Sequence, residues 1–302
     1  RYCRALSEVP ALPATTLTKM CYSAMFSGCS SLTQAPALPA TTLTNSCYDY
    51  MFEGCSSLTQ VPELPATTLA ESCYGGMFMN CTSLSEAPAL PVTTLAEYCY
   101  GHMFELCTSL TQAPALPATT LVDGCYREMF MNCSSLSEVP ALPATTLATN
   151  CYSGMFMNCT SLSEAPALPA TTLVFGCYTS MFYDCASLNR IEVAFTDWGN
   201  YCTPDWLANV SSKGEFVCPE KLQPEFGSNY IPEGWTVKHN DEPEFATGDV
   251  NGDGTVDVID VNVLVSITLG NASADDYNGR ADVNGDGAVD VIDINAILAI
   301  IL

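Results

Sequence analysis

Basic residues are scarce in this chain, and their scarcity limits the partners that it can attract. The 302 residues include nine Lys and Arg against 33 Asp and Glu, which gives a formal net charge of −24. A surface of that sign repels nucleic acid and anionic lipid, so we expect no nucleic-acid partner. Only two histidines are present, which leaves few candidates for acid–base catalysis or for a histidine-rich metal site.

Long hydrophobic runs are also missing, although 48% of the residues are apolar. A membrane-spanning helix needs roughly 20 consecutive apolar residues, so we expect no transmembrane segment. No signal peptide is visible, but the chain begins within a repeat, since Cys3 to Leu6 match the second half of a unit. We therefore expect an extracellular or bacterial cell-surface protein whose signal peptide lies outside this sequence.

Repetition is what the chain has in abundance. Seven units share the pattern Cys-Tyr-x-x-Met-Phe-x-x-Cys-x-Ser-Leu, and each starts 26 residues after the last. Their first cysteines are Cys21, Cys47, Cys73, Cys99, Cys125, Cys151 and Cys177. A unit of this size cannot bury its apolar face alone and has to stack on its neighbours, which predicts a solenoid.

Each unit predicts one helix and one short strand. The first cysteine, the Tyr, the Met, the Phe and the second cysteine fall within an arc of about 140° at 100° per residue, which predicts an amphipathic helix over 21–29 and its equivalents. The following Ser-Leu-Thr-Gln-Ala predicts a strand with Leu32 and Ala35 facing the core, ended by Pro36. The expected fold class is therefore an α/β repeat solenoid over residues 1–194.

The paired cysteines allow three interpretations. A helix separates the two Cα atoms of a unit by roughly 12 Å, beyond the roughly 7 Å limit for a disulfide, which favours buried thiols. An early helix end at Gly28 would instead allow a disulfide within each unit in an oxidising compartment. Zinc is disfavoured, because the spacing does not suit a metal-binding cysteine pair.

The pattern breaks after Phe195, and residues 195–237 read as a C-terminal cap. This stretch contains the chain's three tryptophans, Trp198, Trp206 and Trp235, which would cover the open core of the last unit. A sugar-stacking platform is the alternative. A disulfide between Cys202 and Cys218 is left open at this stage. Residues 238–246 are polar and predict a linker.

The strand face would present a polar stripe of two residues per unit. Its members are Thr33/Gln34, Thr59/Gln60, Ser85/Glu86, Thr111/Gln112, Ser137/Glu138, Ser163/Glu164 and Asn189/Arg190. The stripe is either a surface for a host protein or glycan ligand, or a solvated edge kept polar for solubility. His102 at a variable, solvent-facing position and His239 in the linker suggest no site. No catalytic constellation is visible, so we expect no enzyme.

The strongest chemical signal lies near the C-terminus. "DVNGDGTVDVID" spans 249–260 and "DVNGDGAVDVID" spans 282–293. Each has the spacing D-x-N-x-D-G with an acidic residue at position 12, which wraps oxygen ligands around a hard cation. The predicted ligands are Asp249, Asn251, Asp253, Thr255 (carbonyl), Asp257 (through water) and Asp260, then Asp282, Asn284, Asp286, Ala288 (carbonyl), Asp290 and Asp293. We therefore expect two calcium ions.

Each loop is followed, but not preceded, by an apolar helical segment, and the two copies lie 33 residues apart. In these features residues 247–302 resemble a dockerin, a small all-α calcium-binding domain. The resemblance implies calcium-dependent docking to a cohesin-type partner. It places partner-reading positions just before the closing acid, here Val258, Ile259, Val291 and Ile292. Packing of these side chains against the chain's own cap is a rival explanation.

The repeat run "MFEGCSSLTQVPELP" resembles the BspA-like leucine-rich repeats of bacterial surface proteins, with Met where that family has Ala before Phe. The resemblance covers residues 1–194 and implies a leucine-rich repeat solenoid. We therefore expect a non-catalytic, secreted or cell-surface binding and adhesion protein. The alternatives are a structural spacer subunit and an accessory subunit of a polysaccharide-degrading assembly.

Overall fold

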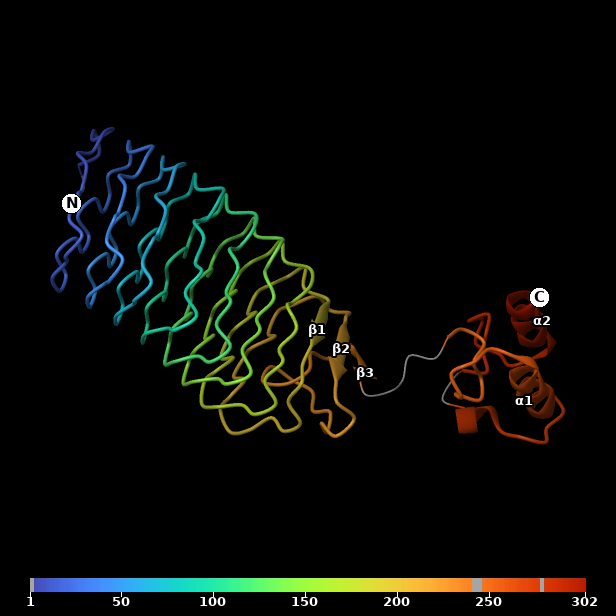
Figure 1. Cartoon of the computed structure of the whole chain (residues 1–302). Coiled ribbons are helices and arrows are strands. Elements are labelled where there is room, and N and C mark those ends of the chain that lie inside the picture. Colours follow the sequence, from blue (N-terminus) through green and yellow to red (C-terminus); the bar gives the residue numbers. More distant parts are fainter. Residues whose placement is uncertain (1–2, 241–245, 278–279) are drawn as a thin grey trace. The chain divides into compact units, whose positions relative to one another are not determined.

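The computed structural model describes residues 3–240, 246–277 and 280–302. The chain forms two compact units, Arg1–Asp241 and Glu242–Leu302 (Figure 1). Most of the predicted linker, residues 241–245, lies outside the described residues, and its first two residues belong to a strand. In the described part of the chain no helix has the length and apolar character needed to cross a bilayer.

Regular secondary structure is sparse in the first unit and confined to its C-terminal end. The strands there are β1 (Arg190–Glu192), β2 (Glu215–Cys218) and β3 (Thr236–His239). The second unit contains α1 (Val258–Thr268), the short 3₁₀ helix η1 (Ala274–Tyr277) and α2 (Val291–Ile301). The rest of the first unit is a stack of coils that runs from the N-terminus to the three strands (Figure 1).

The stretch predicted as a helix forms a ribbon of successive turns, so the helix prediction is wrong. Alternate N–H groups close turns within a coil, as from Ser23 to the carbonyl of Met20 (3.2 Å). The N–H groups between them cross to the next coil, as from Tyr22 to the carbonyl of Cys47 (3.0 Å). Every fourth residue has a positive φ, for example Ala24 at 51°. An α-helix would need all these N–H groups to bond within the coil.

The period of the buried positions explains the error. Counted from the first cysteine, positions 0, 1, 4, 5 and 8 are buried in every unit from Cys47 to Cys177, so pairs of buried residues recur every four residues. Over nine residues, periods of 4.0 and 3.6 differ by only about 80° of accumulated rotation. Both keep the five side chains on one face, and the pattern alone cannot distinguish them. Turns form instead of a helix because they leave half of the N–H groups free to bond to the neighbouring coil.

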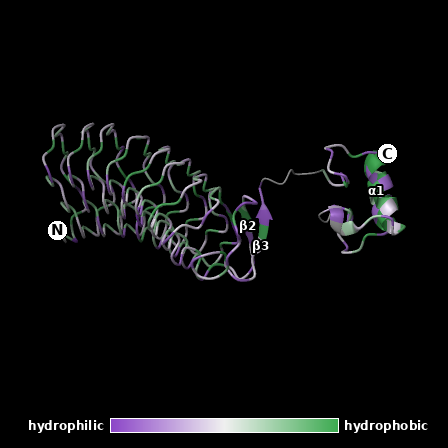
Figure 2. Ribbon diagram, turned by 90° about the horizontal axis from the view of Figure 1, so that it is seen from below, coloured by the Kyte–Doolittle hydropathy of each residue, from purple (hydrophilic) through white to green (hydrophobic). Residues whose placement is uncertain are grey.

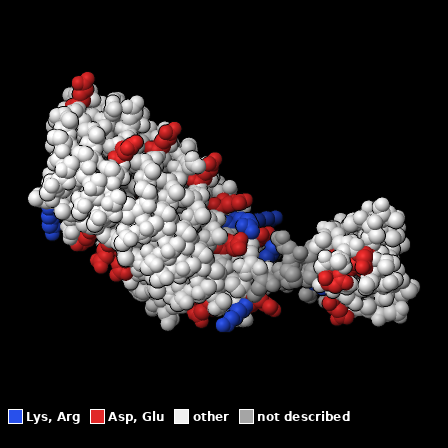
Figure 3. Space-filling view, viewed as in Figure 1, with Lys and Arg blue, Asp and Glu red and all other residues white. Residues whose placement is uncertain are grey.

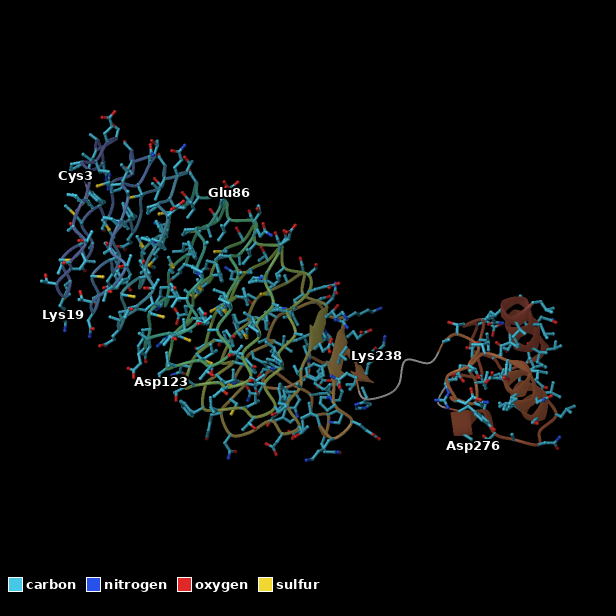
Figure 4. All side chains as sticks on the ribbon, in the orientation of Figure 1. Cys3, Lys19, Glu86, Asp123, Lys238 and Asp276 are labelled. Carbon is cyan, nitrogen blue, oxygen red and sulfur yellow. The ribbon has the colours of Figure 1, made fainter. Side chains whose placement is uncertain are left out.

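The predicted strand is reduced to single parallel bridges between coils, such as Gln34 to Gln60. Leu32 and Ala35 are buried as expected. A second bridge, which the sequence did not indicate, joins Thr42 to Thr68 in the stretch after the prolines. The stripe residues are exposed apart from Arg190, which is half-buried. Figure 4 places Glu86, a member of the stripe, at the edge of the stack opposite Asp123.

Identical side chains stack into columns along the core. The Phe rings from Phe26 to Phe182 lie 5.5–5.8 Å apart between centroids, and their planes are nearly parallel. The Tyr rings from Tyr22 to Tyr178 form a second column with 5.8–6.1 Å spacing. Hydrophobic and hydrophilic segments accordingly alternate along each coil (Figure 2). Burial of these aromatic columns, with the Leu, Met and Cys side chains beside them, drives the stacking of the coils.

The repeat cysteines are buried thiols, all except the exposed Cys21. From Cys55 to Cys185, the second cysteine of each unit donates its thiol hydrogen to a Phe carbonyl of the preceding coil, at 3.0–3.2 Å. Burial raises the pKa of Cys55 to about 12. These sulfurs therefore behave as small core groups with weak hydrogen bonds, and they are protonated at neutral pH.

The rate at which each of these cysteines reacts with a thiol reagent is expected to follow its exposure. In the native protein, only Cys3 and Cys21 among the cysteines of residues 3–185 should react quickly, because the others are buried. After unfolding without reductant, all of them should react. A thiol count in denaturant that finds most of the repeat cysteines blocked would contradict this description.

The cap continues the stack with irregular coils. β1, β2 and β3 form a parallel sheet in that order, with Ile191 beside Phe216 and Phe216 beside Val237. The three tryptophan side chains are 6%, 0% and 5% exposed, so none offers a ring face for stacking a sugar. Trp206 stacks on Tyr178 at 6.1 Å and covers the end of the tyrosine column. This burial agrees with the expected aromatic cap, whose bounds at residues 195–237 stay a prediction.

The two cap cysteines have different neighbours. The Sγ atom of Cys202 lies 3.5 Å from the carbonyl oxygen of Asn200, while the Sγ atom of Cys218 lies 3.9 Å from Nδ1 of His239. Cys202 follows Cys177 in the stack, and the Cys177 thiol donates to the backbone carbonyl oxygen of Cys202 at 3.9 Å. The two cap cysteines do not bridge each other.

Candidate calcium-binding and docking site

In the first predicted loop, backbone N–H groups converge on the carboxylate of Asp249. Both carboxylate oxygens of Asp249 accept N–H bonds, from Gly252 and Asp253 on Oδ1 (2.8 and 3.1 Å) and from Gly254 on Oδ2 (2.9 Å). Gly254 has a φ of 90°, the left-handed conformation that the tight turn requires. This set of bonds folds the loop around the Asp249 carboxylate.

The closing residue of the loop ties it to the following helix. Asp260 is fully buried, and its carboxylate accepts from Asn251 N–H (2.9 Å) and from Asp257 N–H (2.9 Å). Asp257 is the N-cap of α1 and accepts from Ile259 N–H (2.7 Å), so Asp257 and Asp260 form a capping box. The loop and the first turn of α1 are therefore one hydrogen-bonded structure.

The second loop repeats this arrangement closely. Asp282 accepts from Gly285, Asp286 and Gly287, at 2.8, 3.1 and 2.8 Å. The carboxylate of Asp293 is fully buried and accepts from three N–H groups. The acceptor distances match the first loop within 0.1 Å at corresponding contacts of the first aspartate. Asp290 caps α2 as Asp257 caps α1.

The charges of these loops favour a cation. Each loop holds four aspartates within twelve residues, and Asp249, Asp260 and Asp293 are at most 1% exposed. Hydrogen bonds from Thr255, with a further one from Asn251, keep the pKa of Asp253 below its ordinary value, so this carboxylate is charged at neutral pH. Buried carboxylates gathered this closely repel each other without a counter-ion. A donor set made only of oxygens suits calcium.

The predicted partner-reading residues are the first two residues of each helix. Val258 and Ile259 are 64% and 51% exposed, and Val291 and Ile292 are 62% and 52% exposed. The two pairs thus occupy equivalent positions with nearly equal exposure. Behind them, Val250, Leu264, Ala281 and Ile297 form a small core that is fully buried.

The loop aspartates have a second role that the sequence analysis did not predict. Asp257 and Asp290 are the N-caps of α1 and α2. The sequence signal for this role is an Asp directly before two apolar residues, with another Asp three residues after it.

A basic side chain links the two halves of the domain. Arg280 is the single basic residue of 247–302, and its Nε donates to the Val250 carbonyl at 3.2 Å.

A stack of 26-residue coils followed by two calcium-type loops with exit helices defines a leucine-rich repeat protein with a docking module. The BspA type leucine-rich repeat region matches residues 2–137 and 77–205 in six copies, and the dockerin type I domain matches residues 247–302. The chain belongs to the BspA-type leucine-rich repeat family and carries a C-terminal dockerin type I domain. No curated protein and no solved structure matches the chain significantly.

Neither matched module is a catalytic domain. A dockerin type I domain typically binds calcium, and it implies a cohesin-type partner in an extracellular, cellulosome-type assembly. A leucine-rich repeat region suggests protein interaction.

Proposed function

We propose that this protein is a non-catalytic, secreted or cell-surface binding protein whose dockerin domain attaches its repeat region to a cohesin-type partner. Two calcium ions, one per loop, would bind the carboxylates and carbonyls named above and neutralise their charge. The observation that carries the proposal is the pair of exposed apolar dipeptides, Val258–Ile259 and Val291–Ile292, each beside a loop. Exposed apolar groups at fixed helix ends are suited to desolvation against a partner.

The hydrogen bonds explain how calcium would control docking. The closing aspartates Asp260 and Asp293 belong both to the loops and to the capping boxes of the helices. A loop that loses its counter-ion would therefore lose the first helical turn, where the apolar pairs lie. Residues of this chain then do two things: they hold the ion, and through the same carboxylates they orient the docking surface.

The repeat region would offer the second surface. Its polar stripe is exposed, and a shallow groove runs along it between Gln112 and Glu164, lined also by Ser137, Glu138 and Pro140. Acidic side chains are spread singly along this edge of the stack (Figure 3). This arrangement supports recognition of a polar ligand, such as a host protein or a glycan, with adhesion as its result.

Substitution of the apolar pairs tests the docking proposal. Because the pairs are equivalent, changing Val258 and Ile259 to Asp should weaken binding to a cohesin only a few-fold, and so should the same change at Val291 and Ile292. Changing all four should reduce affinity by at least about 100-fold, since burial of a Val or Ile side chain contributes about 1.5–3 kcal/mol and one docked pair buries two of them. Calorimetric titration of a type I cohesin into the calcium-loaded chain measures this.

The matched control is Leu269→Asp, because Leu269 is 69% exposed and is the C-cap of α1, at the opposite end of that helix from Val258 and Ile259. It should bind as the parent does. Unchanged affinity of the fourfold variant for a cohesin that binds the parent would contradict the proposed surface.

A further inference from the structure

A polar cluster lies on the variable side of the coils that begin at Cys99 and Cys125. Nδ1 of His102 is 2.8 Å from Oε2 of Glu105 and 3.3 Å from Oε2 of Glu128. The His102 side chain is 31% exposed and that of Glu105 is 7% exposed. His102 is thus partly buried between two carboxylates, whereas the predicted helix had placed it toward solvent.

The turn ribbon brings these three residues together. His102 and Glu128 occupy the third position after the first cysteine of successive coils, and the His102 N–H group donates to the carbonyl of Arg127 (2.8 Å). Both residues have a positive φ, 57° and 54°, as this position of the ribbon requires. Glu105 follows His102 by three residues within the same coil, and a turn bond joins them (3.1 Å).

The coil after Glu128 leaves room for this cluster. The position equivalent to His102 is Gly154 in that coil, and in the preceding coil it is Gly76, which the Tyr50 ring covers. A Cβ on Gly154 would lie 2.8 Å from Cγ of Glu128, so the glutamate side chain leans into the space that the glycine leaves. The remaining equivalents of His102 are Ala24, Tyr50 and Ser180. An imidazole and a carboxylate therefore meet at this position only once among the seven units.

Neighbouring residues orient the carboxylate oxygens of the cluster. Nε of Arg127 donates to Oε1 of Glu128 (3.0 Å), which leaves Oε2 turned toward His102. The residues equivalent to Glu105 in the coils on either side are Met79 and Met131, so its carboxylate stands between two apolar positions. Two carboxylates face one imidazole. With His102 protonated, these three groups carry a net charge of −1, and Arg127 brings the sum to zero.

We propose that His102, Glu105 and Glu128 bind a divalent transition-metal ion of the zinc class, through Nδ1 and one oxygen of each carboxylate. The ligand atoms all lie within 4.8 Å of one another. Zinc bonds of about 2.0–2.1 Å at tetrahedral angles place ligand atoms about 3.3 Å apart. Nδ1 of His102 lies 3.3 Å from the Glu128 oxygen and 2.8 Å from the Glu105 oxygen. An imidazole with two carboxylates suits zinc better than calcium or magnesium, which take oxygen ligands. The fourth position would be held by water.

Zinc titration of the full chain tests the proposal. The two dockerin loops are first saturated with calcium, and Cys3→Ser and Cys21→Ser remove the exposed thiols. The expected result is one equivalent of bound zinc, lost by at least about 100-fold in affinity in His102→Ala and in Glu128→Gln, because even partners of metal ligands contribute 10–100-fold. Zinc should also raise the melting temperature of the repeat region of the parent, and not of Glu128→Gln.

Two control variants remain outside the cluster. His239→Ala removes the chain's other histidine, and Glu86→Gln removes an exposed carboxylate of the stripe; both should bind zinc as the parent does. Because the Glu128 side chain is 20% exposed, its amide variant should fold normally, which its own melting temperature checks. Absence of a zinc equivalent, or an equivalent that survives both His102→Ala and Glu128→Gln, would show that the cluster is an ion pair and overturn the proposal.

Discussion

Replacing Asp260 and Asp293 together by Ala is expected to unfold the dockerin domain at room temperature, with calcium present. Each carboxylate is fully buried and accepts two or three backbone N–H bonds. Hydrogen bonds to a charged acceptor contribute about 1.5–3 kcal/mol each, and each proposed calcium ion loses a ligand as well. A domain with four fully buried core residues has no comparable reserve of stability.

Scanning calorimetry of the full chain measures this loss. The double variant should lack the transition of residues 242–302 and keep that of the repeat region, and chelation of calcium from the parent should produce the same change. The exposed Asp276→Ala in η1 is the matched control and should leave both transitions in place. A double variant that keeps the parent's dockerin transition would contradict the assigned role of the two carboxylates.

Replacing Phe104 by Ala is expected to lower the melting temperature of the repeat region by roughly 6–20 °C. Phe104 is fully buried at the middle of its column, 5.8 Å from Phe78 and 5.6 Å from Phe130 between ring centroids. Removing a buried Phe costs about 3–5 kcal/mol, and 1 kcal/mol corresponds to about 2–4 °C in a domain of this size. Because each coil is stabilised only by its neighbours, a defect at the centre weakens both halves of the stack.

Thermal unfolding followed by circular dichroism checks this effect. Phe175→Ala is the matched control, since Phe175 has the same side chain in the same region but is 60% exposed. Its substitution should change the melting temperature by no more than about 3 °C. Equal melting temperatures for the two variants would show that the column does not hold the stack together.

The repeat and its core could be predicted because stacking makes each coil bury the same positions. The 26-residue period, the burial of Leu32 and Ala35, and the covering role of Trp206 all follow from that requirement. The turn ribbon could not be predicted from the pattern of burial. Its distinguishing feature is that N–H groups such as that of Tyr22 bond to the next coil, which is a property of the stack and not of one unit.

The two kinds of candidate site differ in how far the sequence could reveal them. The candidate calcium loops could be predicted because their potential ligands lie within twelve consecutive residues, so the spacing itself encodes the geometry. The cluster of His102, Glu105 and Glu128 could not, because two of its members lie 26 residues apart and meet only through the coil register. The exposure of Val258 and Val291 agrees with the dockerin resemblance, and their role in docking remains a prediction.

The central claim is that recognition by the dockerin domain depends on calcium-ordered helix ends. Calorimetric titration of a type I cohesin into the full chain, once with calcium and once after chelation, tests it most directly. We predict saturable binding in calcium and a loss of at least about 100-fold in affinity after chelation, because the capping aspartates and the apolar pairs lose their order together. Binding of equal strength in both conditions would contradict the account.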